Sequence, residues 1–375
     1  MDTITGERDI ETVVIGGGQA GLSAGYHLAK RGRAFVILDA YERVGDNWRC
    51  HWDSLRLYSP ARAASLPGMT FPAPRTYYPT KDEMADFLEA YRAAFELPVH
   101  GGVRVSTVRR DGDRYVVTCT DGSAYRCDNV VVATGTFGRT PRVPAFAGEL
   151  DPGIRQLHSS DYKRPSQLKP GAVLVVGASH SGGDIAFEAG SAGHPVVLSG
   201  PIHGQVPFRI EKRPAKLAYP VLFSLAQHVL TMRTPIGRKM RPEIRAHGGP
   251  FIRVKKADLA GVGVEMTPAR TVGTKNGRPV LDGDRTLDVT NVVWCTGFRQ
   301  DFSWIRLPIT GDDGWPLERR GVVDTAPGLY FVGLAFQYAF SSMLVGGAGR
   351  DAEYVVQHLD AHTAKAAQSR TTTAA

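Results

Sequence analysis

The sequence lacks any apolar run long enough to cross a membrane. Its longest nearly apolar stretch, Tyr219–Leu230, has 12 residues and contains polar interruptions, whereas a spanning helix needs about 20. Residues 1–11 carry acidic side chains and no apolar segment, which is not the pattern of a secretory signal. We therefore expect neither a transmembrane segment nor a secreted protein.

Cysteine is also scarce. The 375 residues contain four, with no C-x-x-C: Cys50, Cys119, Cys127 and Cys295. This set forms neither a disulfide framework nor a zinc ribbon nor a dithiol redox centre. The histidines show no H-E-x-x-H spacing, so no metal site is predicted. These absences fit a reducing compartment, and we expect a cytoplasmic protein.

The overall composition is that of a globular protein. Hydrophobic residues make up 42% and charged residues 22%, which excludes a largely disordered or fibrous chain. The length suffices for two domains of roughly 100–200 residues each. Glycine is abundant, at 42 of 375 residues, or about 11% against a usual ~7%, so the positions of the glycines are informative.

Positive charge gathers in one segment. The net charge is +8, and Arg209–Lys256 alone contains 12 Lys/Arg and two Glu. Three interpretations stay open: a solvated helical excursion, a surface whose field attracts an anionic cofactor or substrate, and a nucleic-acid or membrane-surface contact. Because the segment lacks interleaved aromatics and its apolar part is short, the third is the weakest, and no nucleic-acid partner is expected.

The chain repeats one pattern twice. A β-prone run at 9–15 precedes Gly16-Gly17-Gly18-Gln19-Ala20-Gly21, a helical pattern to residue 28 and a second β-prone run at 34–38. The same order returns at 173–176, with Gly177-Ala178-Ser179-His180-Ser181-Gly182, a helical pattern to about 189 and a β-prone run at 195–198. Repeated strand–glycine-turn–helix–strand order predicts two nucleotide-binding units.

The second halves of the two copies match as well. Residues 103–127 and 262–287 each predict short strands joined by Asp-Gly or Asn-Gly turns. They lead to Ala133-Thr134-Gly135 and to Cys295-Thr296-Gly297. From first to last glycine the copies span 119 residues (16 to 135) and 120 residues (177 to 297), which indicates a duplication.

In the first copy each motif residue has a predicted task. Gly16 permits the tight turn, Gly18 leaves space for a pyrophosphate, and Gly21 lets helix and strand pack closely. The helix start at Gln19 and Ala20 offers N–H groups and partial positive charge to the phosphates. Asp39, which directly follows the second β-prone run, is placed to accept hydrogen bonds from the ribose of an adenosine.

The second copy predicts a related but different site. Gly177, Ser179 and Gly182 take the motif positions, and the counterpart of Asp39 is Ser199-Gly200, which has no carboxylate to repel a 2′-phosphate. This favours NADPH, yet no arginine occupies Gly200 to bind that phosphate, so NADH stays open. Three cations in the following loop serve either the phosphate or only the surface: Arg209, Lys212 and Arg213.

With these motifs the chain resembles the flavin-containing monooxygenases, especially short bacterial members and the plant indole-pyruvate monooxygenases. Besides the glycine motifs, the resemblance is carried by Gly45-Asp46-Asn47-Trp48, Leu55–Pro60, Tyr78-Pro79-Thr80-Lys81 and Gly328–Leu334. The family pattern F-x-G-x-x-x-H-x-x-x-F/Y keeps His158 and Tyr162, but Pro152 and Ile154 replace its Phe and Gly. The Baeyer–Villiger version is not matched.

The resemblance implies an α/β fold of two doubly wound, Rossmann-like domains of the glutathione-reductase-like flavoprotein type, one inserted in the other. The FAD domain is expected at 1–164 and 288–375, and the NAD(P)H domain at 165–287. NADPH or NADH would reduce FAD, and a C4a-hydroperoxide formed with dioxygen would oxidise a small heteroatom-bearing or carbonyl substrate. A flavin reductase or oxidase without oxygenation, and a non-catalytic nucleotide sensor, stay open. The sequence assigns no catalytic residue and no oligomeric state.

The remaining candidates surround the expected flavin. Trp48 packs on the ring or is a core residue, and His158 either orients the nicotinamide or bridges the domains. Gly135, Gly333 and Gly347 follow or begin elements expected to border FAD. Six apolar or aromatic residues are candidates for a dry substrate pocket, or for ordinary core: Leu55, Leu57, Tyr58, Phe336, Tyr338 and Phe340.

Overall fold

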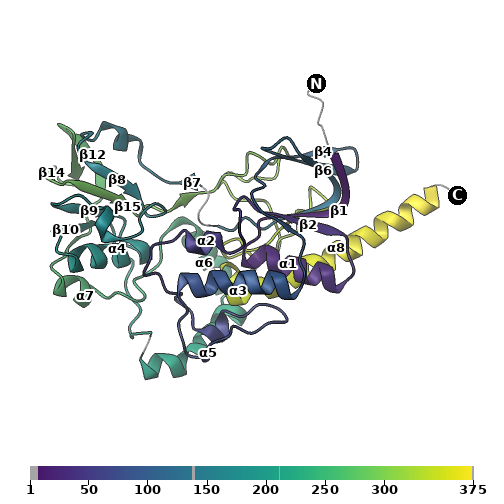
Figure 1. Cartoon of the computed structure of the whole chain (residues 1–375), viewed down its shortest axis with the longest axis horizontal. Coiled ribbons are helices and arrows are strands. Elements are labelled where there is room, and N and C mark those ends of the chain that lie inside the picture. Colours follow the sequence, from purple (N-terminus) through teal and green to yellow (C-terminus); the bar gives the residue numbers. More distant parts are fainter. Residues whose placement is uncertain (1–6, 137–139, 211, 374–375) are drawn as a thin grey trace.

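In the computed structural model, which describes residues 7–136, 140–210 and 212–373, the chain forms two α/β units side by side (Figure 1). Both repeated strand–turn–helix–strand patterns are confirmed. They form β1 (Glu7–Ile15), α1 (Gln19–Lys30) and β2 (Phe35–Leu38), and again β9 (Val173–Val176), α4 (His180–Ser191) and β10 (Val196–Ser199). The predicted fold class, with two Rossmann-like units, is therefore confirmed.

The first unit is built on a seven-stranded sheet of order β3-β2-β1-β6-β5-β4, with β17 also paired to β6. Its further strands are β3 (Val99–His100), β4 (Val105–Asp111), β5 (Arg114–Cys119), β6 (Ala124–Val132) and β17 (Leu329–Phe331). β1, β2, β3, β6 and β17 pair in parallel, whereas β4, β5 and the first half of β6 are antiparallel. The central parallel segments are apolar because both of their faces are covered: residues 13–15 of β1, β2, residues 130–132 of β6, and β17.

The second unit has a five-stranded parallel sheet of order β11-β10-β9-β15-β8. Its remaining strands are β8 (Arg155–His158), β11 (Glu265–Thr267) and β15 (Asn291–Trp294). The expected domain bounds of 165 and 287 assign β8 and β15 to the FAD domain, but both strands pair in this sheet, β15 directly beside β9. We therefore propose wider bounds for the inserted domain, from about residue 150 to about 297.

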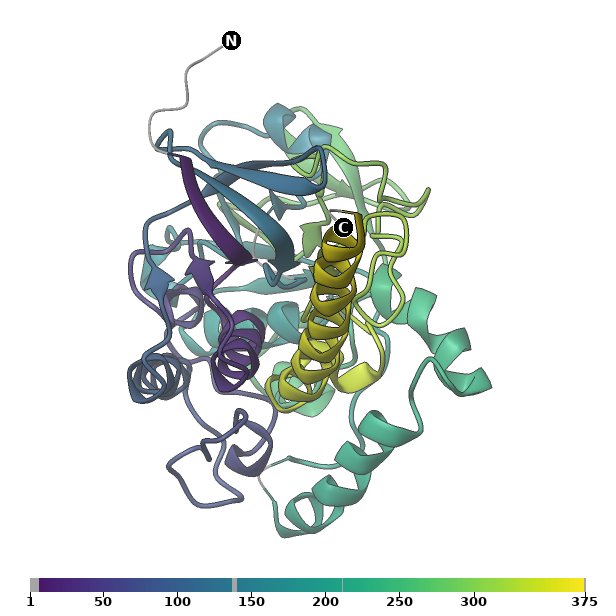
Figure 2. The ribbon, with the colours of Figure 1, turned by 90° about the vertical axis from the view of Figure 1, so that its right-hand side faces the viewer.

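Each sheet buries both of its faces. In the first unit Val14, Ile37 and Val131 face a layer of helices, while the alternate residues face strands β4 and β5 and the segment 302–335. The helices of that layer, α1, α3 (Lys81–Ala94) and α8 (Val345–Thr373), lie along one side of the sheet (Figure 2). In the second unit α4 and α7 (Lys256–Gly261) cover one face. The sheet edges that carry the glycine turns are thereby held rigidly.

Small antiparallel pieces complete each copy. β12 (Thr271–Lys275), β13 (Arg278–Leu281) and β14 (Arg285–Thr286) form a sheet of their own, and β7 (Thr140–Pro141) pairs with β16 (Phe298–Arg299). The predicted turn at Asn276-Gly277 is confirmed, with φ +52° and +73°, the backbone that such hairpins require. Short helical turns are α2 (Asp46–Arg49), η1 (Ala61–Ala63), η2 (Ala145–Glu149), η3 (Pro165–Gln167) and η4 (Phe340–Met343).

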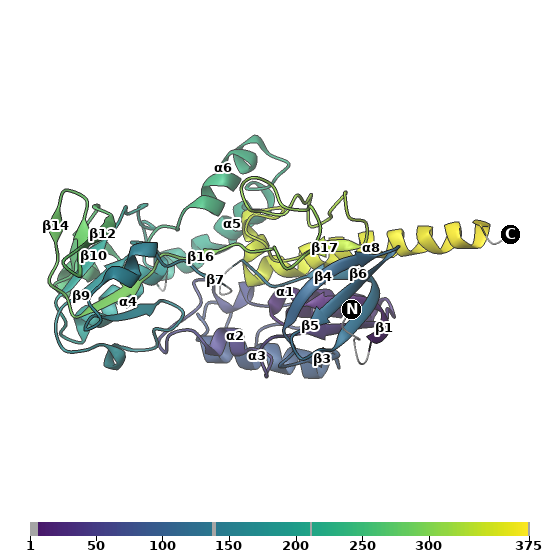
Figure 3. The same cartoon turned by 90° about the horizontal axis from the view of Figure 1, so that it is seen from above.

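The basic segment leaves the second unit and crosses onto the first. Its helices are α5 (Arg213–His228) and α6 (Pro235–Ala246), and we call α5, α6 and their connection the α5–α6 hairpin. Met232 N–H donates to the Tyr338 carbonyl at 2.8 Å, and Phe340 N–H donates to the Leu230 carbonyl at 2.9 Å. Figure 3 shows the hairpin beside the start of α8. Within the described residues no helix meets the length and apolarity of a membrane span.

Candidate functional site

Each glycine-rich turn joins strand to helix in the same way. Gly16 has φ +111°, and a Cβ there would lie 2.6 Å from the carbonyl oxygen of Ala133. Gly177 has φ +107°, and a Cβ there would lie 2.3 Å from the carbonyl oxygen of Cys295. Left-handed backbone and lack of space both restrict these positions to glycine. The two turns are structural equivalents.

The last glycine of each motif packs the helix against the turn. A Cβ on Gly21 would lie 1.8 Å from the carbonyl oxygen of Gly16, and a Cβ on Gly182 would lie 1.8 Å from that of Gly177. These distances admit no side chain. Close backbone packing therefore explains the first and last glycines of both motifs.

The middle position of the first motif borders open space. A Cβ on Gly18 would meet only the Asn47 side-chain nitrogen, at 3.5 Å. Gly18 and Ser179 hold the N-cap positions of α1 and α4 without a side-chain capping bond, whereas α3 begins with a capping box of Thr80 and Glu83. The free N–H groups of an uncapped helix need an outside acceptor. Both turns therefore fit a bound pyrophosphate.

Asp39 lies directly beyond β2 and turns its carboxylate back toward the first motif. Its Oδ2 accepts a hydrogen bond from Gly17 N–H at 2.6 Å, and its Oδ1 accepts one from Tyr41 N–H at 2.9 Å. Burial raises the pKa of Asp39, and these two donors oppose the shift. A carboxylate has about four acceptor positions, so Asp39 keeps capacity for ribose hydroxyls.

Within the predicted pair Ser199-Gly200, Gly200 is the residue that aligns with Asp39. Gly16 N–H donates to the Leu38 carbonyl and Gly177 N–H donates to the Ser199 carbonyl, both at 2.8 Å, so Ser199 corresponds to Leu38 and Gly200 to Asp39. Ser199 is fully buried, and its hydroxyl donates to the Ala269 carbonyl at 2.8 Å. Its side chain is therefore turned away from the nucleotide edge. The motif spacing gives the same alignment, because Gly16 to Asp39 and Gly177 to Gly200 are both 23 residues apart.

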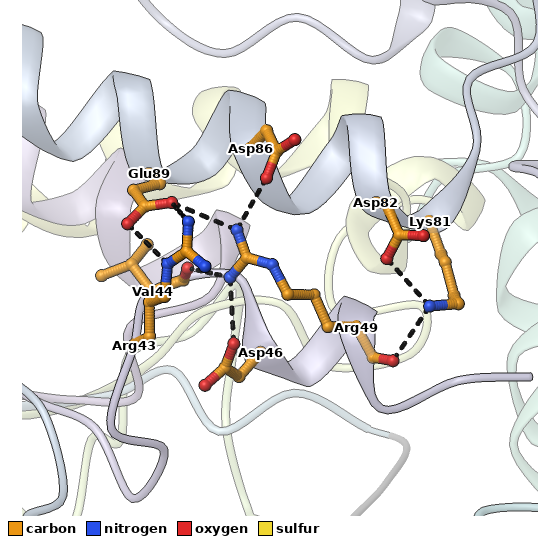
Figure 4. Close-up of polar contacts among 8 residues, drawn as sticks. All are labelled: Arg43, Val44, Asp46, Arg49, Lys81, Asp82, Asp86 and Glu89. Atoms are coloured by element: carbon orange, nitrogen blue, oxygen red, sulfur yellow. Dashed lines mark hydrogen bonds and ion pairs between the residues drawn. The ribbon is translucent and has the colours of Figure 1, made fainter. Parts of the chain in front are cut away.

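The segment that carries Trp48 is fixed to α3 by a polar network (Figure 4). Arg49 donates to Asp46 at 2.9 Å, to Asp86 at 2.8 Å and to Glu89 at 3.1 Å. Arg43 also binds Glu89, and this hydrogen bond lowers the pKa of the Glu89 carboxyl. These ion pairs attach α2 to α3 and thereby fix the orientation of α2.

Two further contacts complete that attachment. Lys81 Nζ donates to the Arg49 carbonyl at 3.1 Å and lies 2.8 Å from Asp82 Oδ1 (Figure 4). Gly45 has φ +91°, and a Cβ there would lie 2.5 Å from the Ala85 carbonyl oxygen. Backbone contact and charge thus hold Trp48 in a defined place.

Trp48 lies at the junction of the two units, because it packs against the apolar cores of both. Its indole Nε1 is buried and has no partner within the described residues, and the same holds for Thr134 Oγ1 and His180 Nε2. An unpaired buried polar group costs about 1–3 kcal/mol. All three come from segments that the sequence places beside a cofactor, which fits groups that a cofactor satisfies.

Tyr58 connects the units through a cluster that the sequence did not reveal. Its hydroxyl donates to Asp184 Oδ2 at 2.9 Å, and Arg253 lies 3.4 Å from the same oxygen. The His180 ring lies 5.2 Å from the Tyr58 ring, centroid to centroid. Burial lowers the pKa of His180 to about 4, so the ring is neutral at pH 7. The signal was present: His180 and Asp184 are four residues apart and share one face of α4.

His158 lies at the end of β8. Its Nε2 is 3.0 Å from the Gly297 carbonyl, and its Nδ1 is 2.9 Å from Ser160 Oγ. Burial lowers the pKa of His158. Because both ring nitrogens have partners, the geometry favours the structural alternative over orientation of a nicotinamide.

The other glycine candidates lie at the ends of elements. A Cβ on Gly333 would lie 2.8 Å from the Ala20 side chain, so the end of β17 borders the start of α1, and a Cβ on Gly347 would lie 1.8 Å from the Ser341 carbonyl oxygen. Gly135, with φ +73°, has open space around it. These positions are consistent with backbone that approaches FAD.

The six pocket candidates divide into two groups. Leu57 and Leu55 belong to the apolar cores of the first and second units, and Phe336 is fully buried. The partly buried residues Tyr58, Tyr338 and Phe340 stay candidates for contact with substrate. Around Tyr338 stand three guanidinium groups, 4.3–5.8 Å from its ring centroid: Arg233, Arg320 and Arg350.

Part of the basic segment has a structural role. Arg241 and Arg245 lie 2.5 and 3.3 Å from Glu318, whose side chain is fully buried. Burial raises the pKa of Glu318 and lowers that of Arg245 to about 10. Arg209 pairs with Asp258 at 2.6 Å, which argues against its predicted contact with a 2′-phosphate. Lys212 is exposed, and the Arg213 side chain lies outside the described residues.

Comparison with known proteins identifies the family. A family model described as pyridine nucleotide-disulphide oxidoreductase matches residues 13–207, a range that contains both glycine turns. The chain belongs to this family. It is 37% identical over 362 residues to an uncharacterised CzcO-like oxidoreductase of Geobacillus kaustophilus, covering 94% of this chain and 99% of the relative.

Two other relatives are monooxygenases. The probable indole-3-pyruvate monooxygenase YUCCA3 of Arabidopsis thaliana is 29% identical, covering 88% of this chain and 84% of the relative. The flavin-containing monooxygenase from Stenotrophomonas maltophilia superposes with a TM-score of 0.75 at 27% identity, covering 95% and 99% of the two chains. The predicted flavin-containing monooxygenase family is confirmed, and with it an oxidoreductase.

Proposed function

We propose that FAD lies along the first unit and the nicotinamide nucleotide along the second, with their reacting rings at the junction marked by Trp48. The observation that carries this assignment is the pair of equivalent, uncapped glycine turns. α3, which has no predicted ligand, caps itself with Thr80 and Glu83. Thr80 and Thr234 close the starts of α3 and α6, whereas the starts of α1 and α4 at the two glycine turns stay available to phosphates.

On the first unit, Gln19 and Ala20 offer their N–H groups to the FAD pyrophosphate across the open face of Gly18, and Asp39 accepts from the ribose. Gly135 and Gly333 let backbone approach the flavin. α8 begins at Val345 and includes Gly347 in its first turn. Its positive end suits the electron-rich edge of reduced flavin.

On the second unit, the N–H groups at Ser179 and His180 take the nicotinamide nucleotide's pyrophosphate. Gly200, the counterpart of Asp39, provides neither a carboxylate to repel a 2′-phosphate nor a cation to bind it. Arg209 is engaged by Asp258. The enzyme therefore accepts both NADPH and NADH, with kcat/KM values within about tenfold of each other, whereas a bidentate arginine contact alone contributes more than that.

Reduced FAD supplies the oxygen chemistry when bound, and the protein's part is to orient and to exclude water. The Tyr58–Asp184 hydrogen bond holds the two units in register, and the α5–α6 hairpin closes over Tyr338 and Phe340. The substrate class is a small molecule with a soft sulfur, nitrogen or activated carbonyl. The expected cytoplasmic location stays a prediction, and the oligomeric state stays open.

The decisive experiment measures coupling. Purified, FAD-loaded enzyme is supplied with NADPH, dioxygen and a panel of thioethers, amines and ketones. Oxygenated product equal to at least half of the NADPH consumed supports the monooxygenase. The alternative, an NAD(P)H oxidase, predicts that hydrogen peroxide accounts for all NADPH consumed with every compound. Purified protein that neither contains nor takes up flavin would refute both.

A further inference from the structure

The α5–α6 hairpin exposes an unusual amount of apolar surface. Nine large hydrophobic side chains are exposed among the described residues, and five of them lie between positions 221 and 236. They are Val221 (63% exposed), Leu222 (42%), Leu225 (43%), Val229 (41%) and Ile236 (51%). Single exposed apolar residues are ordinary, but a gathered group marks a contact surface.

Four of these side chains form one stripe of α5. Val221, Leu225 and Val229 are spaced by four residues, and Leu222 lies beside them, so all four share one face of the helix. The opposite face is already used, because Phe223 touches the start of α8 at Gly346 and Ala226 is buried. α5 is therefore apolar on both sides, and only its inner side has a partner within the described part of the chain.

The surroundings of the stripe are positively charged. From Lys212 to Pro242 the sequence contains seven Lys/Arg and no Asp or Glu. Among the described side chains, Arg233, Arg238 and Lys239 are exposed. The guanidinium groups of Arg233, Arg320 and Arg350 all lie over the ring of Tyr338. The positive region therefore extends from the hairpin onto the first unit.

We propose that the α5–α6 hairpin lies on the surface of an anionic membrane, with the apolar stripe of α5 at the acyl boundary and its basic residues at the headgroups. A helix that combines an exposed apolar stripe with Lys and Arg is typical of such interfacial contacts. The apolar stretch is too short to span a bilayer, but contact with one leaflet requires no span.

A second copy of the chain is a less favourable occupant. In a twofold contact the same surface meets itself, so the uncompensated basic residues of two hairpins would face each other and repel. An anionic lipid surface instead offers the opposite charge and an apolar layer together. The positive charge of the hairpin therefore favours an anionic membrane over a second copy of the chain.

Vesicle binding tests the proposal on the full-length, FAD-loaded protein. We expect at least tenfold stronger sedimentation with vesicles of two parts phosphatidylcholine to one part phosphatidylglycerol than with vesicles of phosphatidylcholine alone, at low salt. Raising the salt to about 0.5 M should weaken the binding several-fold, because the Debye length falls. Equal binding to both vesicles, or no binding, would overturn the proposal.

Variants separate the two parts of the surface. Arg238→Gln/Lys239→Gln should reduce partition roughly 30-fold, because each cation near an anionic surface contributes about 1 kcal/mol. Leu222→Ser/Leu225→Ser should reduce it at least tenfold. The matched control is Val272→Ser/Leu317→Ser, which removes two slightly more exposed side chains elsewhere (51% and 54%) and should leave partition unchanged.

The variants must also remain folded. Flavin content and NADPH consumption in solution should stay at the wild-type level in all three, which shows that lost partition reflects the surface. Size-exclusion chromatography with light scattering tests the rival occupant. A dimer that Leu222→Ser/Leu225→Ser converts to monomer would overturn the membrane proposal in favour of a second copy. The test does not depend on whether the enzyme oxygenates a substrate.

Discussion

The two nucleotide-binding units share a backbone and differ in a few side chains. Gly16 and Gly177 place their turns against equivalent carbonyl oxygens, and the next β-strands return to them through equivalent 2.8 Å hydrogen bonds. Beyond those strands one unit has Asp39 and the other Gly200. On the proposed assignment, the duplicated fold fixes where a dinucleotide lies, and single positions at the edge of the sheet decide which dinucleotide it is.

The largest expected effect comes from a substitution at the middle glycine of the first motif. We expect Gly18→Val to reduce FAD affinity more than 100-fold, since the side chain would project into the space reserved for the pyrophosphate. Because that space is otherwise open, the fold should be retained, as circular dichroism can check. The matched control is Gly148→Val, which also faces open space but lies far from the turn. Yellow, fully loaded Gly18→Val protein would contradict the placement of FAD.

Substitutions at the last glycine of each motif test whether the two turns are equivalent. Gly21→Ala and Gly182→Ala each place a Cβ 1.8 Å from a carbonyl oxygen, and we expect each to destabilise its unit by about 3 kcal/mol. Thermal unfolding measures that loss. Flavin content should fall in the first variant only, and the rate of flavin reduction by NADPH should fall in the second while FAD stays bound. If both variants lost the same cofactor, the assignment of FAD to the first unit and of the nicotinamide nucleotide to the second would be wrong.

Gln19 and His180 occupy the same place in the two motifs, and they predict different pH behaviour. The folded-state pKa of His180 is lowered from 6.5 to about 4. The unfolded chain therefore binds an extra proton between these values, and stability falls as the pH drops from about 6.5 to 4, by about 3 kcal/mol at most. His180→Gln, which copies the first unit, should flatten the fall in Tm over this range.

The control for that experiment is His228→Gln, because His228 is exposed. It should leave the pH dependence of Tm as in the wild type. An unchanged profile in His180→Gln would show that the buried ring of His180 is not the group that titrates.

The smallest expected effects come from substitutions at the nucleotide-binding edges of the two sheets. Asp39→Asn removes a charged acceptor and should weaken FAD binding roughly 10–100-fold, which corresponds to about 1.5–3 kcal/mol. Ser199→Ala should change the KM for NADPH by less than threefold, because the hydroxyl is committed to Ala269. Titration of apoprotein with FAD and steady-state kinetics measure the two effects. A large effect of Ser199→Ala would restore its predicted role.

The sequence determined the local geometry that depends on neighbouring residues. Glycine spacing, β-prone runs and turn pairs such as Asn276-Gly277 act within a few residues, so they predicted both strand–turn–helix–strand patterns, the duplication and the order of the two units. The position of Asp39 at the end of β2 followed from the same spacing. Close backbone approach restricts these positions to particular residue types, which is why the pattern can be recognised in the sequence.

Only the tertiary structure decided what depends on residues far apart in the chain. It placed β8 in the second sheet and brought Tyr58 to Asp184 across the two units. Within the α5–α6 hairpin it also separated Arg241 and Arg245, which pair with the buried Glu318, from the exposed Arg233, Arg238 and Lys239. The place of β8 in the sheet order, contacts between the two units and exposure are set by long-range packing, which the spacing of motifs along the chain does not encode.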